Sequence, residues 1–314
     1  MKHTYLSFCA SALVGIPALS FGISINDTIG LSGAATYGSQ FDAVVGLGYY
    51  DANGDAAVIG TGVLIDSTTI LTAKHNVALG YQLGDEIFFG ADANDGSTVT
   101  RTSTQIINFV DDSTDGDFAD GSDLAILKFA NPITNITPYA INTSATTDLY
   151  FEAYTNVGYG FAGVGSSGVT IFDNAVRYAG QNIVEDFSLE GEGWRITADF
   201  DDGTDVNDSL GGLSYALPYE AATANGDSGG PLLLSYGSQW LVGGILNAGY
   251  TPDGNANAAY GEINIYTSVE QALSWIDANS DATFVDFTVP VPEPTSALLL
   301  GLGGLTLVSR RQRK

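Results

Sequence analysis

A glycine-rich turn around one serine is the stretch of this sequence best suited to chemistry. Residues 226–231 read Gly-Asp-Ser-Gly-Gly-Pro, and the glycines beside Ser228 let the backbone turn tightly. A serine hydroxyl becomes a nucleophile when a base takes its proton and donors stabilise the oxyanion that forms. With 39 glycines in the chain, an ordinary β-turn is the alternative. The partners of Ser228 therefore decide between the two interpretations.

If the serine is activated by an imidazole base, that base can only be His75. The chain has two histidines, and the other, His3, lies in a segment with the pattern of a signal peptide. A zinc site built on two or three histidines and an HExxH metalloprotease are therefore excluded. His75 follows the apolar pair 70–71 and the dipeptide 72–73, which predicts a position at a strand end, facing a cleft. A solvent-exposed or otherwise satisfied histidine is the alternative.

Asp123 is the candidate for orienting the imidazole. It leads directly into the apolar run 124–129, whereas the acidic residues before it occupy a polar loop. A carboxylate that accepts from the far ring nitrogen fixes the histidine tautomer and stabilises the charged ring. The alternative is that Asp123 is the last member of a solvated acidic loop. The N–H groups of Gly226 and Ser228 can point to one spot in a tight turn, which is the geometry of an oxyanion hole.

Two series of strand-like runs would position these residues. Short stretches rich in Val, Ile, Thr, Tyr and Phe alternate with turn-rich segments over residues 41–145 and again over 146–279. About six runs in each series predict an all-β fold with two antiparallel barrels or sandwiches. Apolar residues at helical spacing in 268–279 predict one short C-terminal helix. Residues 23–40 are interpreted as an N-terminal arm and residues 280–291 as a linker.

Both ends of the chain have the pattern of sorting segments. Residues 1–22 carry one lysine, an apolar stretch and then small residues, which predicts a signal peptide. Residues 292–314 resemble the PEP-CTERM tail of Gram-negative bacteria, which an exosortase recognises and cleaves. This resemblance implies an exosortase-like partner, transient membrane association through the tail, and a secreted or cell-surface location. The apolar run 297–308 is shorter than the roughly 20 residues of a spanning helix. The alternative to a cleaved sorting tail is a short permanent anchor.

Charge and cysteine content exclude further classes. Between the two sorting segments there are five basic residues, whereas Glu293 is the only one of the 36 acidic residues outside that region. The resulting net charge, near −30, repels nucleic acid and acidic membranes, so no nucleic-acid partner is expected. The single cysteine, Cys9, lies in the predicted signal peptide. The mature protein therefore has no disulfide although its destination is oxidising.

The three motifs together resemble the chymotrypsin/trypsin-like serine peptidase family. The stretches LTAKH at 71–75, SDLAILK at 122–128 and GDSGGP at 226–231 occur in the family's order, and the likeness extends over about 41–278. The resemblance implies two six-stranded β-barrels with the active site in the cleft between them.

The resemblance also implies a role for each candidate residue. Ser228 would be the nucleophile, His75 the general base and then general acid, and Asp123 the residue that holds the imidazole. Gly226 and Ser228 would supply the oxyanion donors. Asp227 would pair with a new N-terminal amine, but no Lys or Arg lies between Lys2 and Lys74, so a trypsin-like activation cut is excluded.

A substrate pocket follows from the same resemblance. Ala222 stands where trypsin-type members carry an acid, so specificity for Lys or Arg is not expected. Glu220 would partly contradict this if it turned inward. The strand from Asn247 would pair with the substrate backbone. The pocket residues expected are Ala222, Asn225, Asn247, Ala248 and Gly249.

Two acidic turns offer oxygen ligands at alternate positions, which is a ligand type that calcium accepts. Neither turn has the full calcium-loop pattern, with glycine at the sixth and glutamate at the twelfth position. Structural calcium and plain solvated turns therefore both stay open, and no cofactor is required for the chemistry. The candidate ligands are Asp51, Asn53 and Asp55 in one turn and Asp199 and Asp201 in the other.

The sequence thus predicts a secreted or surface-sorted serine endopeptidase that hydrolyses protein or peptide substrates through an acyl-enzyme, as a monomer. A catalytically silent binding or matrix protein on the same fold is the alternative, because fold does not determine function. An esterase is disfavoured, because residues 232–234 after the serine predict a strand rather than the helix of a nucleophile elbow.

Overall fold

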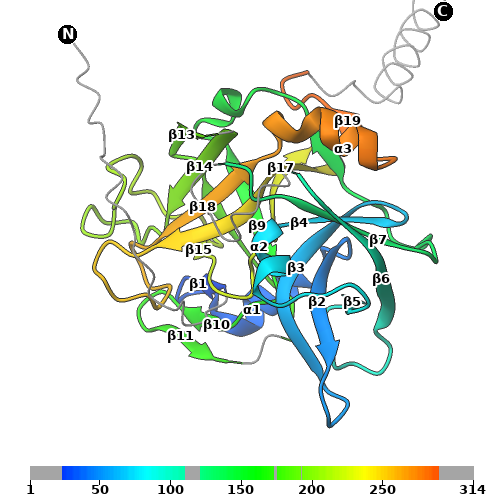
Figure 1. Ribbon diagram of the computed structural model, residues 1–314. Helices are drawn as coiled ribbons and strands as arrows, with labels where there is room; N and C mark the ends of the chain where they lie inside the picture. The colour runs from blue at the N-terminus through cyan, green and yellow to red at the C-terminus, as the bar shows by residue number, and fades with distance from the viewer. Residues whose placement is uncertain (1–22, 110–120, 173–174, 192, 290–314) are drawn as a thin grey trace, which may run out of the picture.

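The computed structural model describes residues 23–109, 121–172, 175–191 and 193–289. The predicted signal peptide, 1–22, and the predicted sorting tail, 292–314, lie outside the described residues. Within those ranges, no helix has the length and apolar character needed to cross a membrane. Strands make up most of the ordered structure, and they group into two halves and one small additional sheet (Figure 1).

The first half is a closed antiparallel barrel, on the right in Figure 1. Large apolar side chains alternate into its interior, among them the fully buried Leu47, Leu64 and Leu127. Thr72 pairs with Ala125, so the end of one strand and the start of another meet at the same rim. The barrel runs in the order β2-β3-β4-β7-β6-β5, with β2 (Val44–Tyr50), β3 (Ala56–Asp66), β4 (Thr69–Thr72), β5 (Glu86–Phe89), β6 (Val99–Asn108) and β7 (Ala125–Phe129).

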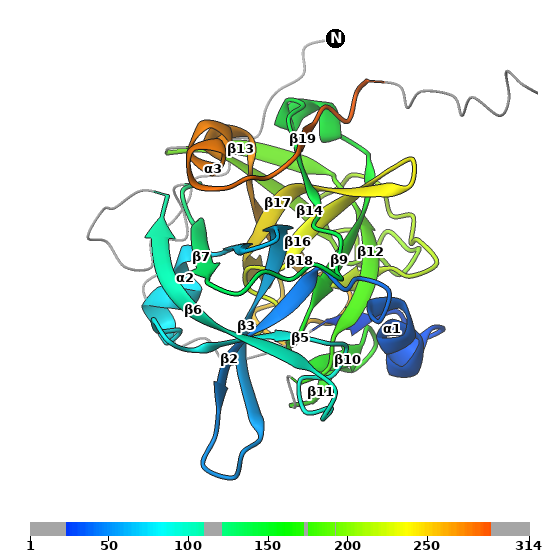
Figure 2. The ribbon, with the colours of Figure 1, turned by 90° about the vertical axis from the view of Figure 1, so that its right-hand side faces the viewer.

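The second half is a nine-stranded sheet in which β8 and β19 attach to the path β12-β9-β16-β17-β18-β14-β13 (Figure 2). The described strand pairs leave this path open, so closure of a second barrel is not seen there. Its flanks nevertheless approach one another, because Asn182 Nδ2 donates to the Asp199 carbonyl at 2.6 Å. The strands are β8 (Ala140–Asn142), β9 (Ala153–Gly158), β12 (Tyr178–Ile183), β13 (Asp186–Glu190), β14 (Gly193–Asp199), β16 (Pro231–Tyr236), β17 (Gln239–Tyr250), β18 (Ile263–Ser268) and β19 (Phe284–Val285).

A small four-stranded sheet, ordered β11-β10-β1-β15, lies beside the second half. Its strands are β1 (Ser24–Ile25), β10 (Ala162–Val164), β11 (Gly168–Ile171) and β15 (Ala221–Ala222). The segment predicted as an arm, 23–40, supplies β1 and the helix α1 (Gly30–Gly38). The segment predicted as a linker, 280–291, supplies β19, which pairs with β8.

The remaining helices are short. α2 (Lys74–Leu79) begins one residue after β4, and a 3-10 turn (Thr146–Leu149) lies between β8 and β9 of the second half. The predicted C-terminal helix is present as a 3-10 turn (Glu270–Ala272) that continues into α3 (Leu273–Asn279). Its apolar face buries Ala272 and Ile276 in the main core, which explains the helical spacing of apolar residues in this part of the sequence.

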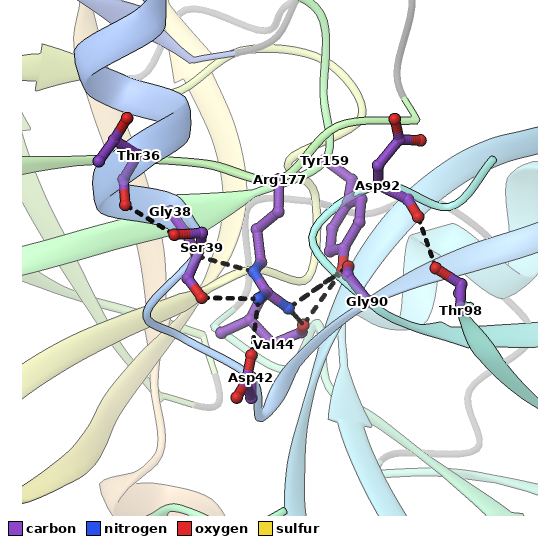
Figure 3. A network of polar contacts seen from close by, with 10 residues as sticks. All are labelled: Thr36, Gly38, Ser39, Asp42, Val44, Gly90, Asp92, Thr98, Tyr159 and Arg177. Atoms are coloured by element: carbon purple, nitrogen blue, oxygen red, sulfur yellow. Dashed lines mark hydrogen bonds and ion pairs between the residues drawn. The ribbon is translucent and has the colours of Figure 1, made fainter. Parts of the chain in front are cut away.

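A buried arginine connects the arm with both halves (Figure 3). Arg177 is fully buried; its Nε donates to Gly38 O at 2.8 Å and its Nη1 to Val44 O at 2.9 Å. Nη1 also donates to Tyr159 Oη at 3.2 Å, and Nη2 forms an ion pair with Asp42 at 3.1 Å. One guanidinium thus satisfies carbonyls of α1 and β2 while it contacts a side chain that follows β9. The planar, five-donor geometry of arginine suits this position.

Candidate active site

His75 and Asp123 meet at the rim of the first barrel. β4 ends at Thr72 and β7 begins at Ala125, and the pairing of these two residues brings the segments just beyond them together. His75 Nδ1 lies 2.6 Å from Asp123 Oδ2, and the His75 backbone N–H donates to Asp123 Oδ1 at 2.8 Å. Both side chains are 4% exposed. The carboxylate therefore holds both the ring and the backbone of the histidine in place.

The second half contributes a further contact to Asp123. Asn247, in β17, is buried, and its Nδ2 donates to Asp123 Oδ2 at 3.1 Å. Sequence reasoning placed Asn247 beside the substrate backbone and missed this side-chain contact. Because an asparagine in a strand has no motif of its own, only the packing of the two halves reveals it. The carboxylate that faces the imidazole is thus supported by donors from both halves.

Ser228 is held at the junction of the halves by its carbonyl. Thr61 N donates to Ser228 O at 2.8 Å, and Asn76 Nδ2 donates to the same oxygen at 2.7 Å. Asn76 belongs to α2 and immediately follows His75, so one short helix positions both the histidine and the serine turn. The sequence analysis gave Asn76 no role, because its contact with Ser228 joins residues that are distant in the sequence.

His75 and Ser228 open onto one small pocket. Its volume is about 50 Å³, and His75, Asn225 and Ser228 are among its lining residues. The remaining lining residues are Ile59, Asn76 and Leu79. The structure therefore brings together His75 and Asp123 by direct contact, and His75 and Ser228 around the same space. Asn225, predicted as a pocket residue, lies in that space as well.

The turn around Ser228 leaves two backbone donors unused. Gly226 has a φ of +92°, a conformation that favours glycine, and a Cβ there would lie 2.7 Å from the Cα of Gly160. Its carbonyl accepts from Thr61 Oγ1 at 2.8 Å, which fixes the peptide plane. Among the hydrogen bonds of the described residues, neither the Gly226 nor the Ser228 N–H is a donor. Both N–H groups are therefore available for an anionic oxygen.

Asp227, between these two residues, is buried and faces backbone donors. Its Oδ1 accepts from Gly160 N at 2.9 Å and its Oδ2 from Ala224 N at 3.0 Å. Burial is the main cause that raises the pKa of Asp227 to about 7, and the two hydrogen bonds oppose it. Within the part of the chain described, two amides thus occupy the carboxylate for which the family resemblance implies an ammonium group.

The other predicted pocket residues lie on two strands. Ala222, in β15, is fully buried in an apolar cluster with Phe200 and Ala258. In β17, pairing with β16 ends at Ile245, whereas pairing with β18 continues to Tyr250. One edge of the stretch 247–250, which includes Ala248 and Gly249, is therefore without a partner strand among the described residues.

The two predicted calcium turns differ in burial. Asp51 is partly exposed, and its Oδ1 accepts from Asn53 N at 2.7 Å and Asp55 N at 3.0 Å, as in an ordinary polar turn. Asp199 and Asp201 are instead buried. They lie together with Glu185, which sequence reasoning missed because an isolated glutamate carries no motif.

Three buried acids in this region have raised pKa values. Burial raises the pKa of Glu185 to about 9 and that of Asp201 to about 7, and neighbouring carboxylates add to both shifts. Glu220 does turn inward and is 1% exposed. Burial raises its pKa well above the usual range, and Asp201, Glu185 and Asp199 push it in the same direction. Glu220 thus belongs to this acidic region of the second half.

Comparison of the sequence with known protein families identifies the family of the chain. The family model named Trypsin matches residues 32–276. The chain belongs to the trypsin family. A second model, the PEP-CTERM protein-sorting motif, matches residues 290–314, and this motif indicates an exported protein that is sorted to the cell surface.

Among solved structures, the trypsin-family fold is shared with neuropsin, a serine protease expressed in the limbic system of mouse brain. The identity is 14%, the TM-score is 0.56, and the match covers 78% of this chain and 96% of neuropsin. No curated protein sequence matches the chain. The predicted all-β, chymotrypsin-like class is confirmed, and the family supports a serine peptidase.

Proposed function

We propose that this protein is a serine endopeptidase whose catalytic residues are Ser228, His75 and Asp123. The observation that carries the proposal is the buried 2.6 Å contact between His75 Nδ1 and Asp123 Oδ2, with His75 and Ser228 on one pocket. Hydrogen bonding at Nδ1 leaves Nε2 as the nitrogen that takes the serine proton.

The reaction is acyl transfer to Ser228. Its Oγ attacks the peptide carbonyl carbon and its proton passes to His75 Nε2, while the N–H groups of Gly226 and Ser228 receive the oxyanion. The imidazolium then gives that proton to the leaving amine, which leaves an ester on Ser228. Water, activated by the same imidazole, hydrolyses the ester and regenerates the serine hydroxyl.

Two features support an endopeptidase whose P1 preference is not Lys or Arg. The free edge of 247–250 can pair with an extended substrate backbone. Ala222 lies in an apolar cluster with Phe200, where a cationic side chain would lack a buried partner. Glu220 points to the acidic region of Asp199 and Asp201 and is hydrogen-bonded to Leu217 N at 2.7 Å.

The tail supports a site of action outside the cell. We propose that a sorting peptidase of the exosortase kind removes the segment matched at 290–314 in a Gram-negative host, and that the mature enzyme acts as a monomer. The hydrolysis of the peptide substrate uses the three catalytic residues and the backbone donors, and the proposal includes no cofactor.

The test compares wild type with Ser228→Ala on casein and with a fluorophosphonate probe. Wild type should cleave casein and be labelled at Ser228, and the variant should lose both while it keeps its far-UV circular dichroism. If the folded wild type neither cleaves nor is labelled, the protein is a catalytically silent binding or matrix protein on the peptidase fold. Cleavage sites from a peptide mixture then report the P1 preference, which should exclude Lys and Arg.

A further inference from the structure

Three buried carboxylates meet where the flanks of the second half approach one another. Glu185 lies between β12 and β13, Asp199 is the last residue of β14, and Asp201 comes two residues later. Their exposed fractions are 5%, 0% and 3%. One carboxylate oxygen from each lies within 4.8 Å of those of the other two. Such proximity of like charges inside a protein requires a compensating partner.

One oxygen of each carboxylate is without a hydrogen-bond partner: Glu185 Oε2, Asp199 Oδ1 and Asp201 Oδ1. The opposite oxygens of the first two are occupied, because Glu185 Oε1 accepts from Leu213 N at 2.8 Å and Asp199 Oδ2 accepts from Leu210 N at 2.9 Å. The 209–213 segment thus orients Glu185 and Asp199, and all three carboxylates keep a buried, unpaired acceptor. Unpaired buried acceptors are rare in native proteins, and each calls for a partner such as an ion, a water or a proton.

Basic side chains do not supply the missing charge. The ion pairs of His75 with Asp123 and of Arg177 with Asp42 do not involve the three acids. Five basic residues in the region between the sorting segments leave few candidates in any case. A cation or a shared proton can instead compensate the negative charge of the three carboxylates. Only a cation site predicts that added metal binds there and stabilises the fold.

We propose that Glu185, Asp199 and Asp201 bind one divalent cation of the calcium type. Calcium takes six to eight oxygen ligands at about 2.3–2.6 Å, so ligand atoms on opposite sides of the ion lie up to about 5 Å apart. The 4.8 Å limit on the three oxygens fits that span. Backbone carbonyls and water complete such a shell, and calcium tolerates the irregular geometry that magnesium does not.

The cation would join segments that are distant in sequence. Asp199 and Glu185 already hold the amides of the 209–213 segment, and Asn182 Nδ2 bridges the Asp199 carbonyl at 2.6 Å and the Ala221 carbonyl at 3.3 Å. A bound ion therefore fixes the two flanks of the sheet, the segment over them and the strand β15 in one cluster. In a chain without disulfides, such an ion would act as a non-covalent cross-link between these segments.

The test titrates calcium into the full chain after dialysis against EGTA at pH 8, with isothermal calorimetry and thermal unfolding as readouts. One calcium ion should bind per chain, and a hundredfold excess over Kd should raise the Tm by about 5 to 10 °C. Sodium chloride at the same ionic strength should raise the Tm clearly less, because it only screens the net negative charge. Neither readout depends on peptidase activity, so the result stands apart from the proposed function.

Glu185→Gln and Asp201→Asn should each weaken calcium binding at least tenfold, and the double variant should abolish it. The matched control Asp51→Asn, in the partly exposed turn, should bind calcium as the wild type does. In EGTA the amide variants should be at least as stable as the wild type, because each replaces a member of the crowded carboxyl cluster with a neutral group that can donate to its neighbours. If a variant does not fold, the wild-type titration still decides. No calcium binding, an equal effect of sodium chloride, or loss of binding in Asp51→Asn alone would each overturn the proposal.

Discussion

Asn247 and His75 bind the same oxygen of Asp123 from opposite halves of the molecule. The Asn247 Nδ2 distance to Asp123 Oδ2 is 3.1 Å and the His75 Nδ1 distance is 2.6 Å. The orientation of the imidazole therefore depends on the docking of the second half onto the first barrel. Asn247 acts through Asp123 and is a positioning residue for the proposed hydrolysis.

Asn247→Ala should lower kcat about 10- to 100-fold and change KM little. A hydrogen bond to a charged group contributes about 1.5–3 kcal/mol, and its loss here affects the alignment of Asp123 and His75 rather than substrate binding. Steady-state kinetics on a peptide substrate measures the split. Asn142→Ala is the matched control, because Asn142 is buried and hydrogen-bonded to Ser144 away from the site. Equal kcat losses in both variants would argue against the role of Asn247.

Arg177→Met should destabilise the protein by about 3–5 kcal/mol. The change removes a buried charged donor from the carbonyls of Gly38 and Val44 and from Tyr159 Oη, and it replaces a planar group that these acceptors surround. Urea unfolding measures the loss. Arg101→Met is the control, because Arg101 is only partly buried although it also donates to a carbonyl, that of Asn131. It should cost less than about 1 kcal/mol.

Asp227 should make the protein less stable as the pH rises from about 4 to 7. Burial raises its folded pKa from 3.8 to about 7. The protonated form therefore favours the folded state below pH 4, and that contribution is lost as the pH rises through the folded pKa. The shift of about 3 units corresponds to an upper value of about 4 kcal/mol.

The check for Asp227 is unfolding by urea at pH 4, 5.5 and 7 for wild type and Asp227→Asn. The other acids titrate in both proteins, so the difference between the two curves isolates this group. Asp227→Asn should have a flatter profile, even though it loses an acceptor for Gly160 N or Ala224 N at every pH. Parallel profiles would contradict the raised pKa.

Gly226→Ala should reduce kcat by about 10²- to 10³-fold. A Cβ at a φ of +92° is strained and would lie 2.7 Å from the Cα of Gly160, so the turn must shift and carry its N–H away from the oxyanion. Gly54→Ala is the control, because Gly54 has a φ of +89° with open space around it in the β2–β3 turn. That variant should lose about 1 kcal/mol of stability and keep its kcat.

The sequence predicted the parts of the site that carry local signals. Ser228 lies in a turn that needs glycines, His75 is the one histidine beyond the predicted leader, and Asp123 precedes a buried strand. The all-β class and the C-terminal helix follow from hydrophobic spacing in the same way. These features depend on neighbours in the chain, so a single sequence reveals them.

The contacts made across the fold could not be predicted in that way. The hydrogen bonds of Arg177 involve α1, β2 and the residue after β9, and Glu185 meets Asp199 only where the sheet approaches itself. Neither residue stands in a distinctive local pattern. The open path of the second sheet depends likewise on pairing between distant strands, which hydrophobic periodicity does not determine.

The strand β1 sets the timing of pocket assembly. Ser24 pairs with Ala222 in β15 and with Gly163 in β10. The first described strand therefore cannot form its sheet until two segments later in the chain have been synthesised. Non-local pairing of this kind is slow, because the entropy of closing a long loop must be overcome first. β15 cannot take its place beside β1 until the chain extends about 200 residues beyond Ser24, so the strand that carries Ala222 joins this sheet late.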